Sequence, residues 1–104
     1  MLYVDDFVPP WGRTRWVHLM SDDVEELHKA AQEIGVERRW YQGTHYDIPL
    51  AKREAALAYG AKAITWRQAG AMMEIRRATG EWVPPREALR RFHELKGTAR
   101  SKRG

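Results

Sequence analysis

The sequence predicts an α/β protein: a small sandwich of a three- or four-stranded sheet with helices packed on it, followed by a basic helical extension. The first observation behind this prediction is the order of hydrophobic periods, which gives strand, strand, helix, strand, helix, strand, helix, helix. The second is that glycine or proline stands at most of the boundaries. The third is composition, since 104 residues with 43% hydrophobic and 31% charged side chains suit one globular domain.

Two strands open the chain. Residues 1–5 form a short strand of alternating side chains, and a loop rich in proline and glycine follows it. The second strand covers residues 13–20, where the alternation places Trp16, His18 and Met20 together on one face.

The clearest helix covers residues 21–35. Ser21 or Asp22 is expected to cap its first turn, and Gly35 ends it. His28 falls on the apolar side of this helix, so we expect its imidazole to be buried and hydrogen-bonded. The apolar stripe that should face the core consists of Val24, Leu27, Ala31 and Ile34.

The middle of the chain continues the alternation. Residues 38–48 are interpreted as one strand that is interrupted at Gly43. A helix over residues 49–60 follows, with a proline suited to its first turn and a glycine at its end. Residues 61–65 form the last short strand.

Two further helices are predicted over residues 65–80 and 84–97, each closed by a glycine. The expected organisation is therefore an α/β core over residues 1–68, a helical extension over residues 69–97 and a disordered basic tail over residues 98–104.

Composition excludes several classes of protein. No apolar run approaches the roughly 18 residues that would span a bilayer, and the N-terminal residues carry acids where a secretory signal would carry lysines. Cysteine is absent, which excludes disulfides, thiolate chemistry and cysteine-ligated zinc. We therefore expect a cytoplasmic protein without a membrane partner, in the host cytoplasm if a phage encodes it.

The net charge of +4 is unevenly distributed. Residues 1–60 contain seven Lys/Arg and ten Asp/Glu, whereas residues 61–104 contain eleven Lys/Arg and four Asp/Glu. The basic C-terminal part indicates either a phosphate-bearing partner such as nucleic acid or a solvated helical face.

The stretch "RRWYQGTHYDIP" combines aromatic, amide, imidazole and carboxylate side chains. If Gly43 marks a β-bulge, the extra residue shifts the alternation, and Trp40, Gln42, His45 and Asp47 point to one side and line a pocket. The alternative is a tight turn at "QGTH" with its polar side chains in solvent.

The spacing of His45 and Asp47 places both groups on one face of a strand, about 7 Å apart. They could bind a divalent metal together, or the carboxylate could orient the imidazole for acid–base catalysis. His18 is the third catalytic candidate. Asp5 ends a strand, where ligands of α/β sheets often bind, so the metal-ligand candidates are Asp5, His45 and Asp47.

Two arginines near this stretch, Arg38 and Arg53, suit a phosphate group because the guanidinium can bind two oxygens at once. The simpler explanation for both is an ion pair with a neighbouring acid. If the arginines do bind a phosphate group, Trp40 and Gln42 would shape the cavity beside it.

Over about two-thirds of its length, the chain resembles the domain-of-unknown-function 4031 family of short bacterial and bacteriophage proteins. The similarity covers "YVDD", the segment from "WGRTRWVHLMSDD" to "HYDIP", and "KREAALAYGAKAITWRQ", which together lie within about residues 3–68. Because the family is uncharacterised, the resemblance implies a site but no reaction, and it adds Arg13 and Tyr46 to the ligand-binding candidates. The recurring family features here are Asp5, Gly12–Arg13, His18–Leu19, Ser21–Asp22, Glu26–Leu27–His28, Gly35, His45–Tyr46–Asp47, Arg53 and Gly60–Ala61.

Three functions remain open at this point. The first is a site for a nucleotide-like or phosphorylated small ligand, with metal-assisted phosphoester hydrolysis as its specific form. The second is a non-catalytic phage protein that binds a host factor or sequesters a signal, with or without oligomerisation. The third is a nucleic-acid-binding protein that uses the basic C-terminal region.

Overall fold

The computed structural model describes residues 1–6 and 15–103, so Arg13 and the predicted proline-rich loop lie outside the described residues. The chain divides into two compact units, Met1–Trp66 and Arg67–Gly104, and each is considered by itself. None of the helices in the described ranges combines the length and the apolar character needed to cross a membrane.

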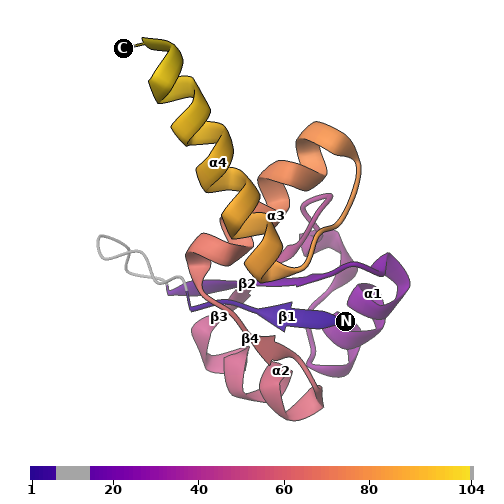
Figure 1. The fold of residues 1–104 in the computed structure, drawn as a ribbon. Coiled ribbons are helices and arrows are strands. Elements are labelled where there is room, and N and C mark those ends of the chain that lie inside the picture. The colour runs from indigo at the N-terminus through magenta and orange to yellow at the C-terminus, as the bar shows by residue number, and fades with distance from the viewer. Residues whose placement is uncertain (7–14, 104) are drawn as a thin grey trace. The chain divides into compact units, whose positions relative to one another are not determined.

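The first unit contains a four-stranded mixed sheet (Figure 1), which makes the protein α/β as predicted. The strand order is β3-β2-β1-β4. β2 pairs antiparallel with both β3 and β1, whereas β4 pairs parallel with β1. The strands are β1 (Leu2–Val4), β2 (Trp16–Ser21), β3 (Tyr46–Pro49) and β4 (Lys62–Ala63).

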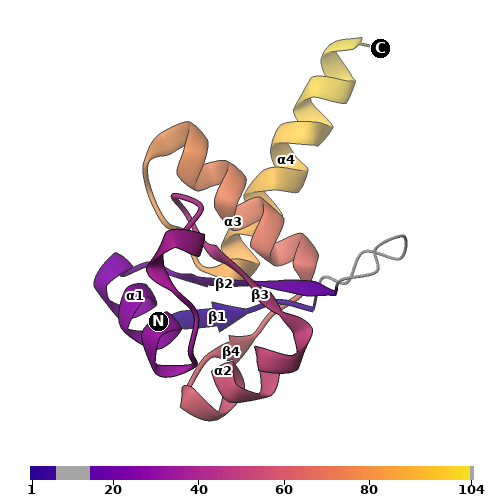
Figure 2. The same cartoon turned by 180° about the vertical axis from the view of Figure 1, so that it is seen from behind.

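One face of this sheet carries the hydrophobic core. The helices α1 (Val24–Glu33) and α2 (Arg53–Tyr59), which Figure 2 shows beside the sheet, contribute to this core. Their buried alanines and one leucine belong to the same cluster as the inward side chains of the strands. Because β-strand side chains alternate, the residues between these core positions point to the opposite face. The fully buried core side chains from the strands include Val4, Val17, Leu19, Tyr46 and Ile48.

The start of α1 differs from the prediction. Asp23, rather than Ser21 or Asp22, is the N-cap, and its carboxylate accepts hydrogen bonds from the backbone N–H groups of the next turn. The Ser21 hydroxyl instead accepts from the Asp23 N–H and donates to Glu26. Val24 is therefore the first residue of the helix and is 48% exposed, so it does not belong to the apolar stripe.

The predicted strand over residues 38–48 is wrong in its first half. Residues Arg38–Trp40 form a 3₁₀ turn, η1, and Tyr41 then makes an antiparallel bridge to Tyr46. The Gln42 N–H donates to the His45 carbonyl at 2.8 Å, and Gly43 between them has φ +90°. A glycine with positive φ at the first central position is typical of a type II′ hairpin turn, so Gly43 forms a tight turn and not a bulge.

Two helix boundaries also shift. The helix predicted from residue 49 begins at Arg53, after a 3₁₀ turn, η2 (Leu50–Lys52), because the proline still belongs to β3. The last helix, α4 (Pro85–Arg103), continues through Gly97, so the tail predicted to be disordered is helical as far as Arg103. One glycine inside a helix costs only about 1 kcal/mol, which the hydrogen bonds of the continuing helix can offset.

The second unit is formed mainly by α3 (Trp66–Thr79) and α4. Several of its arginines contact glutamates within their own helix, at one helical turn of separation. Exposed pairs of this kind contribute little to stability. Because residues 61–104 contain eleven Lys/Arg and four Asp/Glu, the region keeps an excess of positive charge. The pairs are Arg77–Glu74, Arg90–Glu94 and Arg91–Glu87.

Gly35 provides a test of the junction after α1. It has φ +82°, and an added Cβ would lie 3.1 Å from Lys52 Nζ, which donates to the Ile34 carbonyl. We expect Gly35→Ala to destabilise the protein by about 1–2 kcal/mol, the cost of a left-handed alanine. The matched control is Gly70→Ala, which has open space around it within α3 and should leave stability equal or slightly increased. Urea denaturation of both variants measures the difference, and equal midpoints would contradict the prediction.

Candidate metal centre

Three polar residues form a row across the sheet on the face opposite the core. His18 in β2 is directly paired with Asp47 in β3. Asp5 follows the last residue of β1, and its N–H donates to the His18 carbonyl at 3.1 Å. Each of the three alternates with core residues, which is why all three point the same way. The row therefore places one carboxylate on each side of the His18 imidazole.

Asp5 holds His18 through two contacts. The His18 backbone N–H donates to Asp5 Oδ1 at 2.7 Å, and the ring Nδ1 donates to Asp5 Oδ2 at 2.6 Å. Asp5 is fully buried, so these contacts act in a poorly solvated environment. Burial lowers the pKa of His18, but the hydrogen bond to Asp5 and the charges of Asp5 and Asp47 outweigh it and leave the pKa above its ordinary value. The Nδ1–H contact directs Nε2 toward Asp47.

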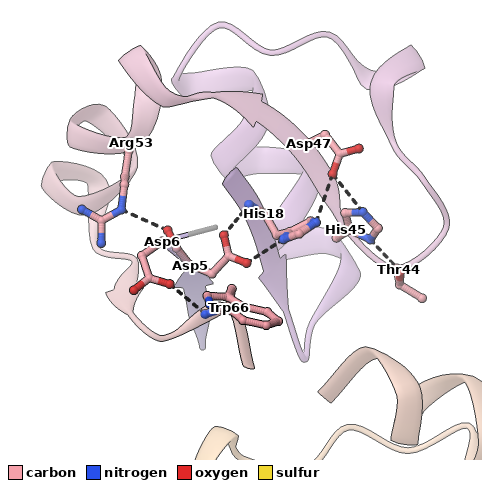
Figure 3. A network of polar contacts seen from close by, with 8 residues as sticks. All are labelled: Asp5, Asp6, His18, Thr44, His45, Asp47, Arg53 and Trp66. Atoms are coloured by element: carbon pink, nitrogen blue, oxygen red, sulfur yellow. Dashed lines mark hydrogen bonds and ion pairs between the residues drawn. The ribbon is translucent and has the colours of Figure 1, made fainter. Parts of the chain in front are cut away.

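His45 joins this row from the turn before β3 (Figure 3). Its Nε2 lies 3.1 Å from Asp47 Oδ1, and the same oxygen lies 3.6 Å from His18 Nε2. The two imidazole rings are 5.0 Å apart and nearly perpendicular. The hydrogen bond from His45 lowers the pKa of Asp47 against the opposing effect of burial, and the charges of both histidines add to this lowering. Asp47 is therefore ionised at neutral pH.

The geometry of His18, His45 and Asp47 fits a metal ion. One ligand atom from each residue lies within 4.8 Å of the others. Tetrahedral ligands at zinc distances of about 2.0–2.2 Å are separated by about 3.3–3.6 Å. The separations of Asp47 Oδ1 from His45 Nε2 and from His18 Nε2, 3.1 and 3.6 Å, are close to that range.

Both histidines have a second partner of the kind that metal-ligating histidines use. His18 Nδ1 donates to Asp5, and His45 Nδ1 lies 2.8 Å from the hydroxyl oxygen of Thr44. Such contacts fix the tautomer and the ring orientation so that Nε2 can ligate. Thr44 was not among the predicted site residues, although its position next to His45 in a short turn was a usable signal.

Comparison with known proteins identifies the family. Residues 2–76 match the family described as "Protein of unknown function (DUF4031)". The chain belongs to this family. No curated protein and no solved structure matches the chain. The match extends to residue 76 and so includes most of α3.

Asp5 has a different role from the one predicted for this DUF4031 protein. It was expected to be a metal ligand with His45 and Asp47, but both of its carboxylate oxygens contact His18. His18 lies between Asp5 and Asp47 and takes the place of Asp5 in the three-residue group. Asp5 is fully buried at the end of β1, and its two carboxylate oxygens are engaged with His18.

The other predicted ligand-binding residues do not surround the metal-ligand group. Trp40 is 51% exposed, and the Arg39 guanidinium lies over its ring at 5.2 Å. Gln42 is exposed in the hairpin turn. Tyr46 points to the core face of β3, and Arg38 in η1 lines a cleft with it, away from the metal-ligand group. The bulge that would have aligned Trp40 and Gln42 with His45 and Asp47 is absent.

Arg53 supports the end of β1. Its Nε donates to the Asp5 carbonyl at 3.0 Å, and Figure 3 shows it on the side of Asp5 away from His45 and Asp47. Asp6 makes a related contact, since it accepts the Trp66 backbone N–H at 2.8 Å. These two contacts join the carboxyl end of β1 to α2 and to the start of α3.

His28 is hydrogen-bonded as predicted but only half-buried. Its Nδ1 lies 2.7 Å from the Tyr46 hydroxyl, and its ring packs edge-on against Tyr41. Tyr46 points to the core face of β3, so His28 does not converge with His18 and His45.

Proposed function

We propose that His18, His45 and Asp47 bind a divalent metal ion of the zinc type, and that the protein is a metal-dependent hydrolase of phosphoesters in small, nucleotide-like ligands. The observation that carries this proposal is the convergence of two imidazoles and one carboxylate, with each imidazole held by a second partner. Two histidines and one carboxylate leave coordination positions for water and substrate, as in catalytic rather than structural zinc sites.

A metal bound in this way supplies a water of lowered pKa and polarises a phosphoryl oxygen. The protein residues supply the orientation. Asp5 keeps the His18 proton on Nδ1, and the Thr44 hydroxyl oxygen can accept a hydrogen bond from His45 Nδ1–H when Nε2 becomes a ligand. Asp47 brings the negative charge that stabilises a divalent cation, and its partial exposure leaves the site open to a substrate.

Metal binding is the first test. We expect the protein to bind about one equivalent of Zn²⁺ in isothermal titration calorimetry. His45→Ala and Asp47→Ala should each weaken binding by at least about 100-fold, because removal of a direct ligand exceeds the 10–100-fold effect typical of supporting residues. His93→Ala is the matched control, since this exposed histidine of α4 lies outside the group and its loss should leave affinity unchanged. Equal losses for all three variants would contradict the assignment.

Hydrolysis is tested separately with bis(4-nitrophenyl) phosphate and with nucleoside phosphates. Activity should require added metal and should disappear in His45→Ala while His93→Ala retains it. If Zn²⁺ binds with the expected residue dependence but none of these esters is cleaved, the hydrolase proposal fails and the metal site stands. If no metal binds, both parts of the proposal fail.

A further inference from the structure

A cleft lies on the core side of β3, between α1 and the segment that follows α1. Its volume is about 640 Å³, within the range of small-molecule sites in proteins. It belongs entirely to the first unit, and none of the three metal-ligand residues lines it. Its lining mixes polar and apolar surface and consists of Glu25, His28, Lys29, Gln32, Gly35, Val36, Glu37, Arg38 and Tyr46.

The pairing of His28 with Tyr46 determines what the cleft wall offers to a ligand. Tyr46 is fully buried, and a buried hydroxyl needs an acceptor for its proton. Among the described residues, the acceptor available to it is His28 Nδ1, at 2.7 Å. An imidazole that accepts a hydrogen bond at Nδ1 carries its proton on Nε2. His28 therefore presents an N–H donor, and Tyr41 packs edge-on at 4.7 Å against its ring and holds it in this orientation.

Two cations line the cleft without an internal partner. Within the described part of the chain, neither Lys29 nor Arg38 makes a side-chain hydrogen bond or an ion pair. The acid next to Arg38 is already engaged, because Glu37 pairs with Arg39 at 2.7 Å. Arg38 and Tyr46 line the same cleft. Burial raises the pKa of Tyr46, and the positive charge of Arg38 opposes that rise.

We propose that this cleft is a second ligand site, which binds the phosphate group of a small molecule through His28 Nε2–H, Lys29 and Arg38. An imidazole, an ammonium and a guanidinium from two different segments can each donate to a different oxygen, which suits a tetrahedral anion better than a planar carboxylate. Inorganic phosphate would occupy only a small part of 640 Å³, so the ligand also has a body about the size of a nucleoside.

This site is independent of the proposed metal centre. Tyr46 and Asp47 are consecutive in β3, so their side chains point to opposite faces of the sheet. Binding in the cleft therefore needs no metal. A ligand held here could be taken up whether or not the metal centre is catalytic.

Calorimetry on the full chain in buffer containing EDTA tests the site with inorganic phosphate, adenosine monophosphate and acetate as probes. We expect the nucleotide to bind at least about tenfold more tightly than phosphate, and phosphate more tightly than acetate. Arg38→Ala and Lys29→Ala should each weaken nucleotide binding by about tenfold or more, the effect expected for a lost charge-assisted contact. Arg15→Ala, which removes an exposed arginine outside the cleft, is the matched control and should change nothing.

Tyr46→Phe tests the role of the hydroxyl without removing the ring. It should lower nucleotide affinity several-fold while the circular dichroism spectrum stays that of the folded protein. In ¹⁵N NMR spectra of the parent protein, His28 should show the proton on Nε2. The proposal is overturned if the nucleotide does not bind at millimolar concentration, or if acetate or phosphate alone binds as tightly as the nucleotide. It is also overturned if Asp47→Ala abolishes binding and Arg38→Ala does not.

Discussion

Asp5→Ala should destabilise the protein by about 3–5 kcal/mol, the cost of removing one member of a buried, hydrogen-bonded pair. The reason is that Asp5 is fully buried and accepts both the backbone N–H and the ring Nδ1–H of His18. Without the carboxylate, two partly buried donors lose their acceptor at once. The midpoint of urea denaturation measures this loss.

Asp5→Asn separates stability from metal binding. The amide keeps the size of the carboxylate but has one oxygen, so it cannot accept both His18 donors in the observed geometry. If its NH₂ group faces the ring, it donates to Nδ1 and moves the histidine proton to Nε2, where it blocks a metal ion. We expect a smaller loss of stability than in Asp5→Ala, together with 10–100-fold weaker Zn²⁺ binding.

A purely structural role for Asp5 would give a different pattern. The Asn variant, once shown to be folded, would then bind Zn²⁺ as tightly as the parent protein. His93→Ala again serves as the control for changes that do not involve the site. Unchanged stability of Asp5→Ala would also contradict the burial and the hydrogen bonds on which this prediction depends.

The alternation of side chains accounts for what could be predicted about the site. Asp5, His18 and Asp47 each alternate with apolar neighbours, so their common face followed from the sequence once the strands were recognised. The pairing of His18 with Asp47 did not follow, because strand order and register depend on contacts between distant segments. For the same reason, the sequence did not show that Asp5 supports His18 rather than binding a metal.

The error at residues 38–43 has a local cause. A glycine between two polar residues fits a bulge and a hairpin turn equally well in a single sequence. The hydrogen bond from the Gln42 N–H to the His45 carbonyl decides for the turn, and it depends on the bridge between Tyr41 and Tyr46. As a result, Trp40 and Gln42 lie outside the metal-ligand group, whereas His45 belongs to it.

The N-cap of α1 could not be predicted from the sequence alone either. Three consecutive residues, Ser21, Asp22 and Asp23, are all good N-caps, and propensity alone does not choose among them. Asp23 accepts the two backbone N–H groups of the first turn, while Ser21 is engaged with Glu26. A later start of the helix leaves Val24 exposed, which neither the spacing nor the hydrophobicity of the segment indicated.

Leu19→Ala should produce a comparably large loss of stability from the other face of the sheet. Leu19 is fully buried in β2, is paired with Val4 on one side and with Tyr46 on the other, and belongs to the core cluster below α1. Truncation to alanine removes apolar contacts and leaves a cavity, at a cost of about 2–5 kcal/mol. The free energy of unfolding from urea titration measures the effect.

Val24→Ala is the control for this prediction, because Val24 was expected to face the core but is 48% exposed, whereas Leu19 is fully buried. The exposed valine should change stability by less than about 0.5 kcal/mol. Leu19 is next to His18 in β2 but is not one of the three metal-ligand residues. Leu19→Ala should therefore weaken Zn²⁺ binding less than His45→Ala or Asp47→Ala does. A Val24→Ala loss as large as that of Leu19→Ala would mean that α1 packs on the sheet through a face that includes Val24.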